Sequence, residues 1–134
     1  MKKVLCFGTF DILHDGHEEF LKDCKKQGDY LIVNVISDGL VYKNKNKFPV
    51  NSQKTRVSNL ESLKIADQVI AVSDDDDKNL DSINDIRPDV IAVGYDQRTK
   101  FIDRLKEFLR DRELNVNYYF SREFADGIHS SHLR

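Results

Sequence analysis

The sequence has few cysteines, no excess of basic residues and no long hydrophobic run. No apolar stretch approaches the roughly 18 residues of a membrane-spanning helix, which argues against a membrane protein. Lys and Arg number 21 against 23 Asp and Glu, a formal net charge of −2, so the overall charge gives no argument for nucleic-acid binding. Cys6 and Cys24 fit free thiols in a reducing cytoplasm. A disulfide or metal pair stays open, although no second cluster of ligands supports it.

The N-terminal sequence MKKVLCFG begins like a secretory signal peptide. Its apolar stretch is interrupted by Gly8, Thr9 and Asp11, so we interpret it as the first strand of the core and expect a cytoplasmic protein. A length of 134 residues predicts a single domain over residues 1–134. A content of 40% hydrophobic and 33% charged residues is typical of soluble globular chains.

Apolar segments with strand character alternate with segments of helical periodicity along the chain. Strands are expected at residues 4–7, 30–36, 68–72, 89–94 and 115–120. Helices are expected from His17 to near Gly28 and over residues 53–65, 79–86 and 101–109. This alternation predicts an α/β domain with a parallel sheet, whose ligands bind beyond the carboxyl ends of the strands.

Two polar segments and one arginine each leave two interpretations open. Residues 42–51, YKNKNKFPVN, form either a solvated loop or a mobile arm that brings ammonium groups onto a triphosphate. Residues 74–77 are four consecutive aspartates, for which helix capping is favoured over a metal site. Arg56 lies in the first turn of a helix, where the dipole disfavours a cation, so it is either exposed or serves a nearby anion.

The segment from residue 4 to 24 is the stretch around which the chain is organised. An apolar strand ends at Gly8, a polar turn follows, and a helix begins near His17. The unpaired N–H groups and the dipole of a helix N-terminus attract anions. His14 and His17, three positions apart, can add imidazole donors to phosphate oxygens. A lone histidine at such a place is more often a solvated or capping residue, so the combination carries the argument.

The run GTFDILHDGH resembles the signature G-T/S-F-D-x-x-H-x-G-H of the cytidylyltransferase-like nucleotidyltransferases, and every signature position is present. The similarity extends to the lysine-rich segment, Arg56, a Gly-x-Asp after the fourth strand, and the tail. The chain looks most like glycerol-3-phosphate cytidylyltransferases. Archaeal-type FAD synthetases are a close rival, and phosphopantetheine adenylyltransferases are more distant relatives.

The resemblance implies a Rossmann-like five-stranded parallel sheet, in the order 3-2-1-4-5, with helices on both faces. It also implies that a phosphorylated alcohol attacks the α-phosphorus of a nucleoside triphosphate and that pyrophosphate leaves. Such transfer needs mainly alignment and stabilisation of spread negative charge. CTP is favoured over ATP, and glycerol 3-phosphate or a similar small phosphorylated alcohol is the expected acceptor. Nucleotidyl transfer to FMN and a non-catalytic nucleotide-binding module are the alternatives.

The resemblance also assigns roles to individual residues. The catalytic residues it implies are His14, His17, Lys47 and Arg122, with the imidazoles charged beside phosphate. The implied nucleotide-binding residues are Gly8, Thr9, Phe10, Gly16, Asp96, Gly127, Ile128, His129, Ser130 and Ser131. The implied acceptor-binding residues are Asp11, Asp38, Lys45 and Arg56. Mg²⁺ is expected as the counter-ion of the triphosphate, with no protein residues assigned as its ligands, and a homodimer is common in the family.

The tail SREFADGIHSS departs from the family pattern R-T-x-G-I-S-T-T. One extra residue separates Arg122 from Gly127, and His129 stands in place of a serine. These differences leave the nucleobase and the acceptor open, and they bear less on the type of reaction.

Overall fold

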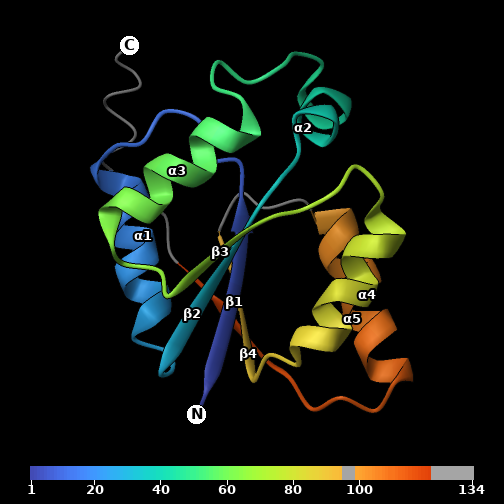
Figure 1. The fold of residues 1–134 in the computed structure, drawn as a ribbon. Helices are drawn as coiled ribbons and strands as arrows, with labels where there is room; N and C mark the ends of the chain where they lie inside the picture. The colour runs from blue at the N-terminus through green and yellow to red at the C-terminus, as the bar shows by residue number, and fades with distance from the viewer. Residues whose placement is uncertain (95–98, 122–134) are drawn as a thin grey trace.

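The computed structural model describes residues 1–94 and 99–121, which form a single parallel sheet flanked by helices (Figure 1). The strands are β1 (Lys3–Gly8), β2 (Tyr30–Val35), β3 (Gln68–Ala71), β4 (Val90–Val93) and β5 (Asn117–Phe120). The helices are α1 (Asp15–Lys25), α2 (Asp38–Lys45), α3 (Gln53–Leu63), α4 (Asp76–Ile86) and α5 (Thr99–Asp111). No helix within these residues is long and apolar enough to span a bilayer.

The strand order β3-β2-β1-β4-β5 confirms the expected Rossmann-like topology. β1 is central, and it pairs in parallel with β2 on one side and β4 on the other. Its apolar side chains are buried on both faces of the sheet, which explains why this strand reads as a continuous hydrophobic run. Because all five strands are parallel, their carboxyl ends lie along one edge of the sheet.

Helices α1 and α3 cover one face of the sheet, and α4 and α5 cover the other (Figure 1). The buried side chains of the sheet form one hydrophobic cluster on each face. On one face, Cys6 of β1 packs with residues of α1 and α3, including Cys24 and Leu60. On the other face, Leu5 packs with residues of α4 and α5, including Leu105. Cys6 and Cys24 are both buried free thiols, as expected. Alternate residues of β1 therefore serve opposite layers, which fixes the strand between them.

The expectation of a loop over residues 42–51 is wrong in its first half. Residues 38–45 form α2, which begins after Ser37, whose Oγ accepts from the N–H of Leu40 at 3.1 Å. The helix ends at Asn46, which adopts a left-handed conformation with φ of 62°. The alternation of Lys and Asn concealed this helix, because it buries only Leu40 and Val41 and has little apolar face.

Two helix starts also differ from the sequence prediction. α1 begins at Asp15, two residues before His17, and α4 begins at Asp76 instead of Asn79. The preferred capping interpretation of the aspartate run is confirmed, since Asp75 Oδ1 accepts from the N–H of Asp77 at 2.9 Å. Within the described part of the chain, no group of three or more His, Cys, Asp or Glu side chains could hold a metal ion.

Candidate functional site

The turn between β1 and α1 is held by a ring that folds back over the end of the strand. Phe10 has a φ of 52°, an uncommon conformation for a residue with a side chain. Its ring is buried and passes so close to Gly8 that a Cβ built there would lie 2.6 Å from a ring carbon. The same ring packs edge-on against the imidazole of His17, with centroids 5.7 Å apart. Gly8 and Phe10 thus act together to place the turn over the carboxyl end of β1.

His14 is the N-cap of α1, and His17 completes the capping arrangement. The Nδ1 atom of His14 accepts from the N–H of Gly16 at 3.1 Å. The Nδ1 atom of His17 accepts from the N–H of His14 at 3.3 Å. The local sequence places two imidazoles where a serine and a glutamate commonly form a capping box. The cap and the expected phosphate site therefore use the same two residues.

The two imidazole rings are stacked, with centroids 4.0 Å apart and an interplanar angle of 29°. Since each Nδ1 atom accepts a backbone N–H, each neutral ring carries its proton on Nε2. The turn thereby supplies two Nε2–H donors from His14 and His17 beside the N-terminus of α1. Donors of this kind, set in advance by the backbone, suit phosphate oxygens.

The surroundings of His17 determine its protonation in the protein without ligand. Burial is the main cause that lowers the pKa of His17 to about 4, and electrostatic interactions with His14 and Lys45 contribute to the same shift. In the protein without ligand His17 is therefore neutral at pH 7. The expected charged imidazole concerns the phosphate-bound state and stays a prediction. A dianionic or more highly charged ligand close to the ring would raise this pKa, since an opposite charge favours imidazolium.

Arg56 joins the loops that follow β1 and β2. Its guanidinium is fully buried, so of the two interpretations left open by the sequence, the exposed one is wrong. Its Nη1 atom donates to the carbonyls of Thr9 at 2.8 Å and Ile36 at 2.9 Å, and its Nε atom donates to Asn51 at 3.0 Å. Its Nη2 atom donates to Asp38 Oδ1 at 2.5 Å, an ion pair that compensates the buried charge. These contacts give Arg56 a positioning role, and its expected contact with the acceptor stays a prediction.

Asp11 holds the loop before α3 against the β1–α1 turn. Its carboxylate accepts from the backbone N–H groups of Val50 at 2.7 Å and Asn51 at 2.8 Å. The Asn51 side chain donates in return to the carbonyl of Asp11 at 2.8 Å. Sequence reasoning missed Asn51, and its place immediately before the Ser52 cap was the available signal. The carboxylate of Asp11 is thus committed to protein N–H groups, although its predicted contact with the acceptor stays a prediction.

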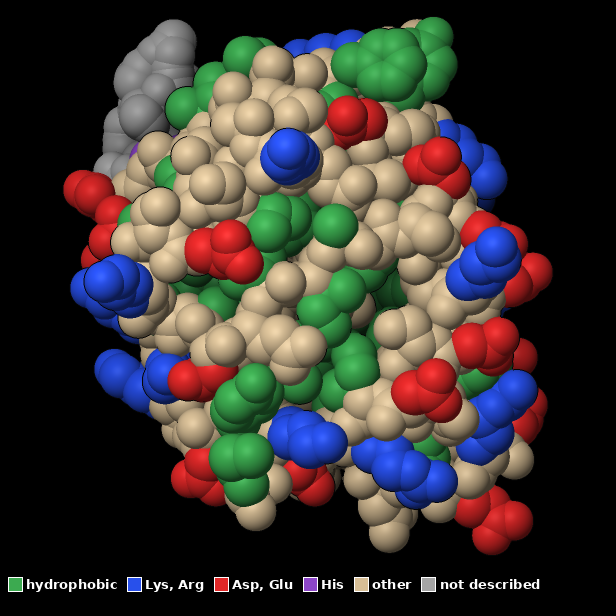
Figure 2. Space-filling view, in the orientation of Figure 1, with side chains coloured by type: hydrophobic (Ala, Val, Ile, Leu, Met, Phe, Trp, Pro, Cys, Tyr) green, Lys and Arg blue, Asp and Glu red, His purple; other side chains and the backbone are tan. Residues whose placement is uncertain are grey.

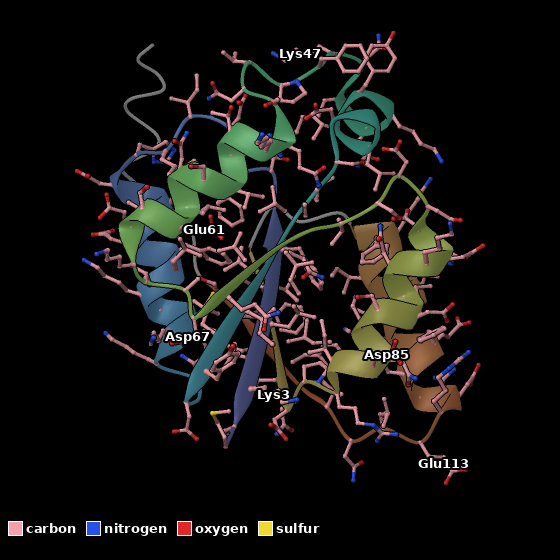
Figure 3. The ribbon with its side chains drawn as sticks, in the orientation of Figure 1. Lys3, Lys47, Glu61, Asp67, Asp85 and Glu113 are labelled. Carbon is pink, nitrogen blue, oxygen red and sulfur yellow. The ribbon has the colours of Figure 1, made fainter. Side chains whose placement is uncertain are left out.

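Lysines gather near this edge, but on two different elements. Lys45 lies on α2, and Lys47 lies in the loop that follows it, far from Lys3 at the opposite end of the sheet (Figure 3). Exposed hydrophobic atoms also gather at the α2 end of the molecule (Figure 2). There the half-exposed ring of Tyr42 stacks on the exposed ring of Phe48, with centroids 4.6 Å apart. The edge therefore combines ammonium groups with aromatic surface.

The predicted residues fall into two sets. One set lies at the carboxyl edge of the sheet: the turn of residues 8–17 and Asp38, as their positions after β1 and β2 predicted, and also Lys45, Lys47 and Arg56. Asp96, Arg122 and the segment 127–131 lie outside the described residues. The described part therefore supports a site for a phosphate chain built from a helix N-terminus, two imidazoles and nearby lysines.

Comparison with protein-family models matches residues 5–134 to the family described as cytidylyltransferase-like. A FAD synthase of Ferroglobus placidus is 45% identical over 116 residues, which are 87% of this chain and 73% of that protein. A FAD synthase of Aciduliprofundum boonei is 37% identical over 127 residues, 94% of this chain and 82% of that protein. A solved structure from Thermoplasma volcanium, described as a lipopolysaccharide core biosynthesis protein, has a TM-score of 0.82 at 31% identity. The match covers 92% of this chain and 98% of that one.

Proposed function

Because this chain belongs to the cytidylyltransferase-like family and is a nucleotidyltransferase, we propose that it transfers the AMP part of ATP to FMN, forming FAD. The relatives named FAD synthase favour FMN as the acceptor over glycerol 3-phosphate. They also favour ATP over CTP, since FAD contains an adenylyl group. Our first expectation from the sequence, cytidylyl transfer to a small phosphorylated alcohol, is therefore replaced by its alternative.

In the proposed reaction, a phosphate oxygen of FMN attacks the α-phosphorus of ATP. A new P–O bond forms, the bond from the α-phosphorus to the bridging β-phosphate oxygen breaks, and pyrophosphate leaves with that electron pair. No covalent intermediate with the protein is needed, so the protein has to align the two phosphates and stabilise the charge that develops.

The observation that carries the proposal is the stacked pair of His14 and His17 at the N-terminus of α1. Their Nε2–H groups and the first backbone N–H groups of the helix would donate to the phosphate oxygens of ATP. Lys45 and Lys47 would contribute positive charge from α2 and the following loop. Mg²⁺ would arrive with ATP, through phosphate oxygens and water, and would neutralise part of the triphosphate charge.

The remaining predicted residues complete this proposal. Asp96, Arg122 and residues 127–131 are proposed to contact the base, the ribose and the triphosphate, as the resemblance implies. Homodimer formation also stays a prediction, which sedimentation at several protein concentrations would test.

The test is a screen for pyrophosphate release with ATP and CTP, each combined with FMN, glycerol 3-phosphate and other polyol phosphates in the presence of Mg²⁺. We expect release with ATP and FMN, with FAD as the second product by chromatography. Release with CTP and glycerol 3-phosphate alone would restore the earlier expectation. Nucleotide binding without release from any pair would favour a non-catalytic module, and thermal shift with ATP and Mg²⁺ would detect that binding.

A further inference from the structure

A narrow pocket lies on the face of the sheet opposite α1, at the carboxyl edge. Its residues come from the ends of β1, β2 and β3 and from α2, α4 and α5, and they include Phe7, Ile36, Val72, Leu40, Ile83 and Phe101. The empty space, counted together with open solvent at its mouth, is about 440 Å³, but the centre of a water-sized sphere can occupy only about 30 Å³ of it, so the pocket is a thin slot. The lining is largely apolar, and Phe7 and Phe101 meet edge to face with centroids 5.9 Å apart. Such a pocket suits a flat apolar ring better than a polyol.

One polar atom in this pocket has no partner. Asn34 interrupts the apolar run of β2, is only 2% exposed, and lines the pocket beside Phe7, its pairing partner in β1. Among the described residues, Asn34 Oδ1 is the one buried side-chain oxygen or nitrogen without a hydrogen bond. The other amide of the lining, Asn79, accepts from the N–H of Ser73 and donates to the Ser73 carbonyl and to Asp76. A buried acceptor left unpaired is costly, so a water or ligand donor is required there.

We infer that this pocket receives the isoalloxazine ring of the acceptor, with the Asn34 amide hydrogen-bonded to the polar edge of the ring. The inference rests on the proposed function. An Asn side chain offers an acceptor and a donor side by side, which matches the N–H and C=O groups of the flavin pyrimidine edge. The apolar remainder of the flavin would lie against Phe7, Leu40 and Phe101.

The position of the pocket favours the acceptor over the nucleobase. Its strand-end residues follow β1, β2 and β3, whereas the segments expected to bind the base follow β4 and β5. The phosphate-binding turn starts from the same end of β1, immediately after Phe7. A molecule with its ring in this pocket would pass over the end of β1 to reach His14 and His17, and the ribityl chain of FMN is a spacer of that kind.

The test uses the full chain and the variant Asn34→Leu, which keeps the size of the side chain and removes its amide. The matched control is Asn59→Leu on the exposed surface of α3. Flavin fluorescence is titrated with FMN and with lumiflavin, the ring without ribityl phosphate. KM is measured for FMN and for ATP. We expect Asn34→Leu to weaken binding of both flavins by about 10- to 100-fold. The KM for FMN should rise by a similar factor. KM for ATP should stay unchanged and the melting temperature should not fall. The control variant Asn59→Leu should match wild type in all these measurements.

A ring methylated at N3, which lacks the imide N–H, makes the test specific. Wild type should bind 3-methyl-lumiflavin about 10- to 100-fold more weakly than lumiflavin, whereas Asn34→Leu should bind the two equally. Absence of lumiflavin binding to wild type, or an effect of Asn34→Leu on KM for ATP instead of FMN, would overturn the inference. So would unchanged flavin binding in the variant. If wild type binds lumiflavin through Asn34 but releases no pyrophosphate with FMN, the proposed function fails while the ring site stands.

Discussion

Thr9 and Arg56, which are 47 residues apart in the chain, are joined by a hydrogen bond of 2.8 Å from the guanidinium to the Thr9 carbonyl. This bond ties the β1–α1 turn to the first turn of α3. The same guanidinium also binds Asp38 at the start of α2. The relative positions of the β1–α1 turn, the segment between β2 and α2, and α3 therefore depend on the side chain of Arg56, which has no exposed surface.

Replacement of Arg56 by lysine should destabilise the fold and impair turnover together. A single ammonium group cannot donate to the carbonyls of Thr9, Ile36 and Asn51 and to Asp38 at once. We expect a loss of about 3 kcal/mol in the free energy of unfolding, measured by urea denaturation. The control is Arg110→Lys on the exposed surface of α5, which should change little. An unchanged urea midpoint in Arg56→Lys would contradict the role given to this residue.

Replacement of His14 by asparagine separates helix capping from phosphate binding. Asparagine is a good N-cap, so the melting temperature should stay close to that of wild type. The Nε2–H donor is lost, and we expect pyrophosphate release to fall by about 10²–10³-fold. His17→Ala should likewise abolish turnover while the fold remains intact. Wild-type rates of pyrophosphate release in either variant would remove that histidine from the mechanism.

The ionisation of His17 should be visible by NMR. In the protein without ligand, its C2–H resonance should titrate with a pKa of about 4, because burial disfavours the charged ring. Addition of ATP should move this pKa upward, since the triphosphate favours imidazolium. Titration near the ordinary value of 6.5 without nucleotide would show that the ring is solvated and would refute the packed arrangement with Phe10.

The same shift makes the stability of the protein depend on pH. The pKa of His17 is lower in the folded chain, about 4, than the ordinary 6.5 of an unfolded one, so the unfolded state binds the proton first. The contribution of His17 is complete above about pH 6.5 and is lost as the pH falls toward 4. The full loss is about 3 kcal/mol. Urea denaturation at pH 7 and pH 5 should show a larger drop in wild type than in His17→Asn, and equal drops would contradict the shift.

Gly8→Ala should displace the ring of Phe10. The new Cβ would lie 2.6 Å from a ring carbon, closer than any normal contact, so the turn must shift. We expect a destabilisation of about 1–3 kcal/mol and slower turnover. The double variant Gly8→Ala with Phe10→Leu removes the clash, so its cost should be smaller than the sum of the two single costs. Additive costs would show that the ring and the glycine are independent.

Asp11→Ala should release the loop of residues 46–51 from the β1–α1 turn. The carboxylate that accepts from Val50 and Asn51 would be absent, and trypsin should cleave after Lys47 about tenfold faster. The control is Asp81→Ala on exposed α4. ATP with Mg²⁺ should slow cleavage of wild type if the loop closes on the nucleotide. Equal cleavage of wild type and Asp11→Ala would show that the clamp does not hold the loop.

The aspartate run and the two histidines show which local features could be predicted from the sequence. The strand–turn–helix of residues 4–24 and the capping role of residues 74–77 were predicted because both depend on neighbours within a few positions. Helix α2 was missed because its stability depends on Leu40 and Val41 packing onto distant elements and hardly at all on its own pattern.

The sequence by itself determined the alternation of strands and helices, the order of a parallel sheet through its family resemblance, and the place of His14 and His17 at a helix start. Only the tertiary structure decided that Arg56 is buried between loops, that His17 is neutral, and that Asn34 faces a pocket. Periodicity and motif spacing act over a few residues and can be read along the chain. Burial and hydrogen bonding of a side chain depend on residues that the folded sheet brings together from distant positions.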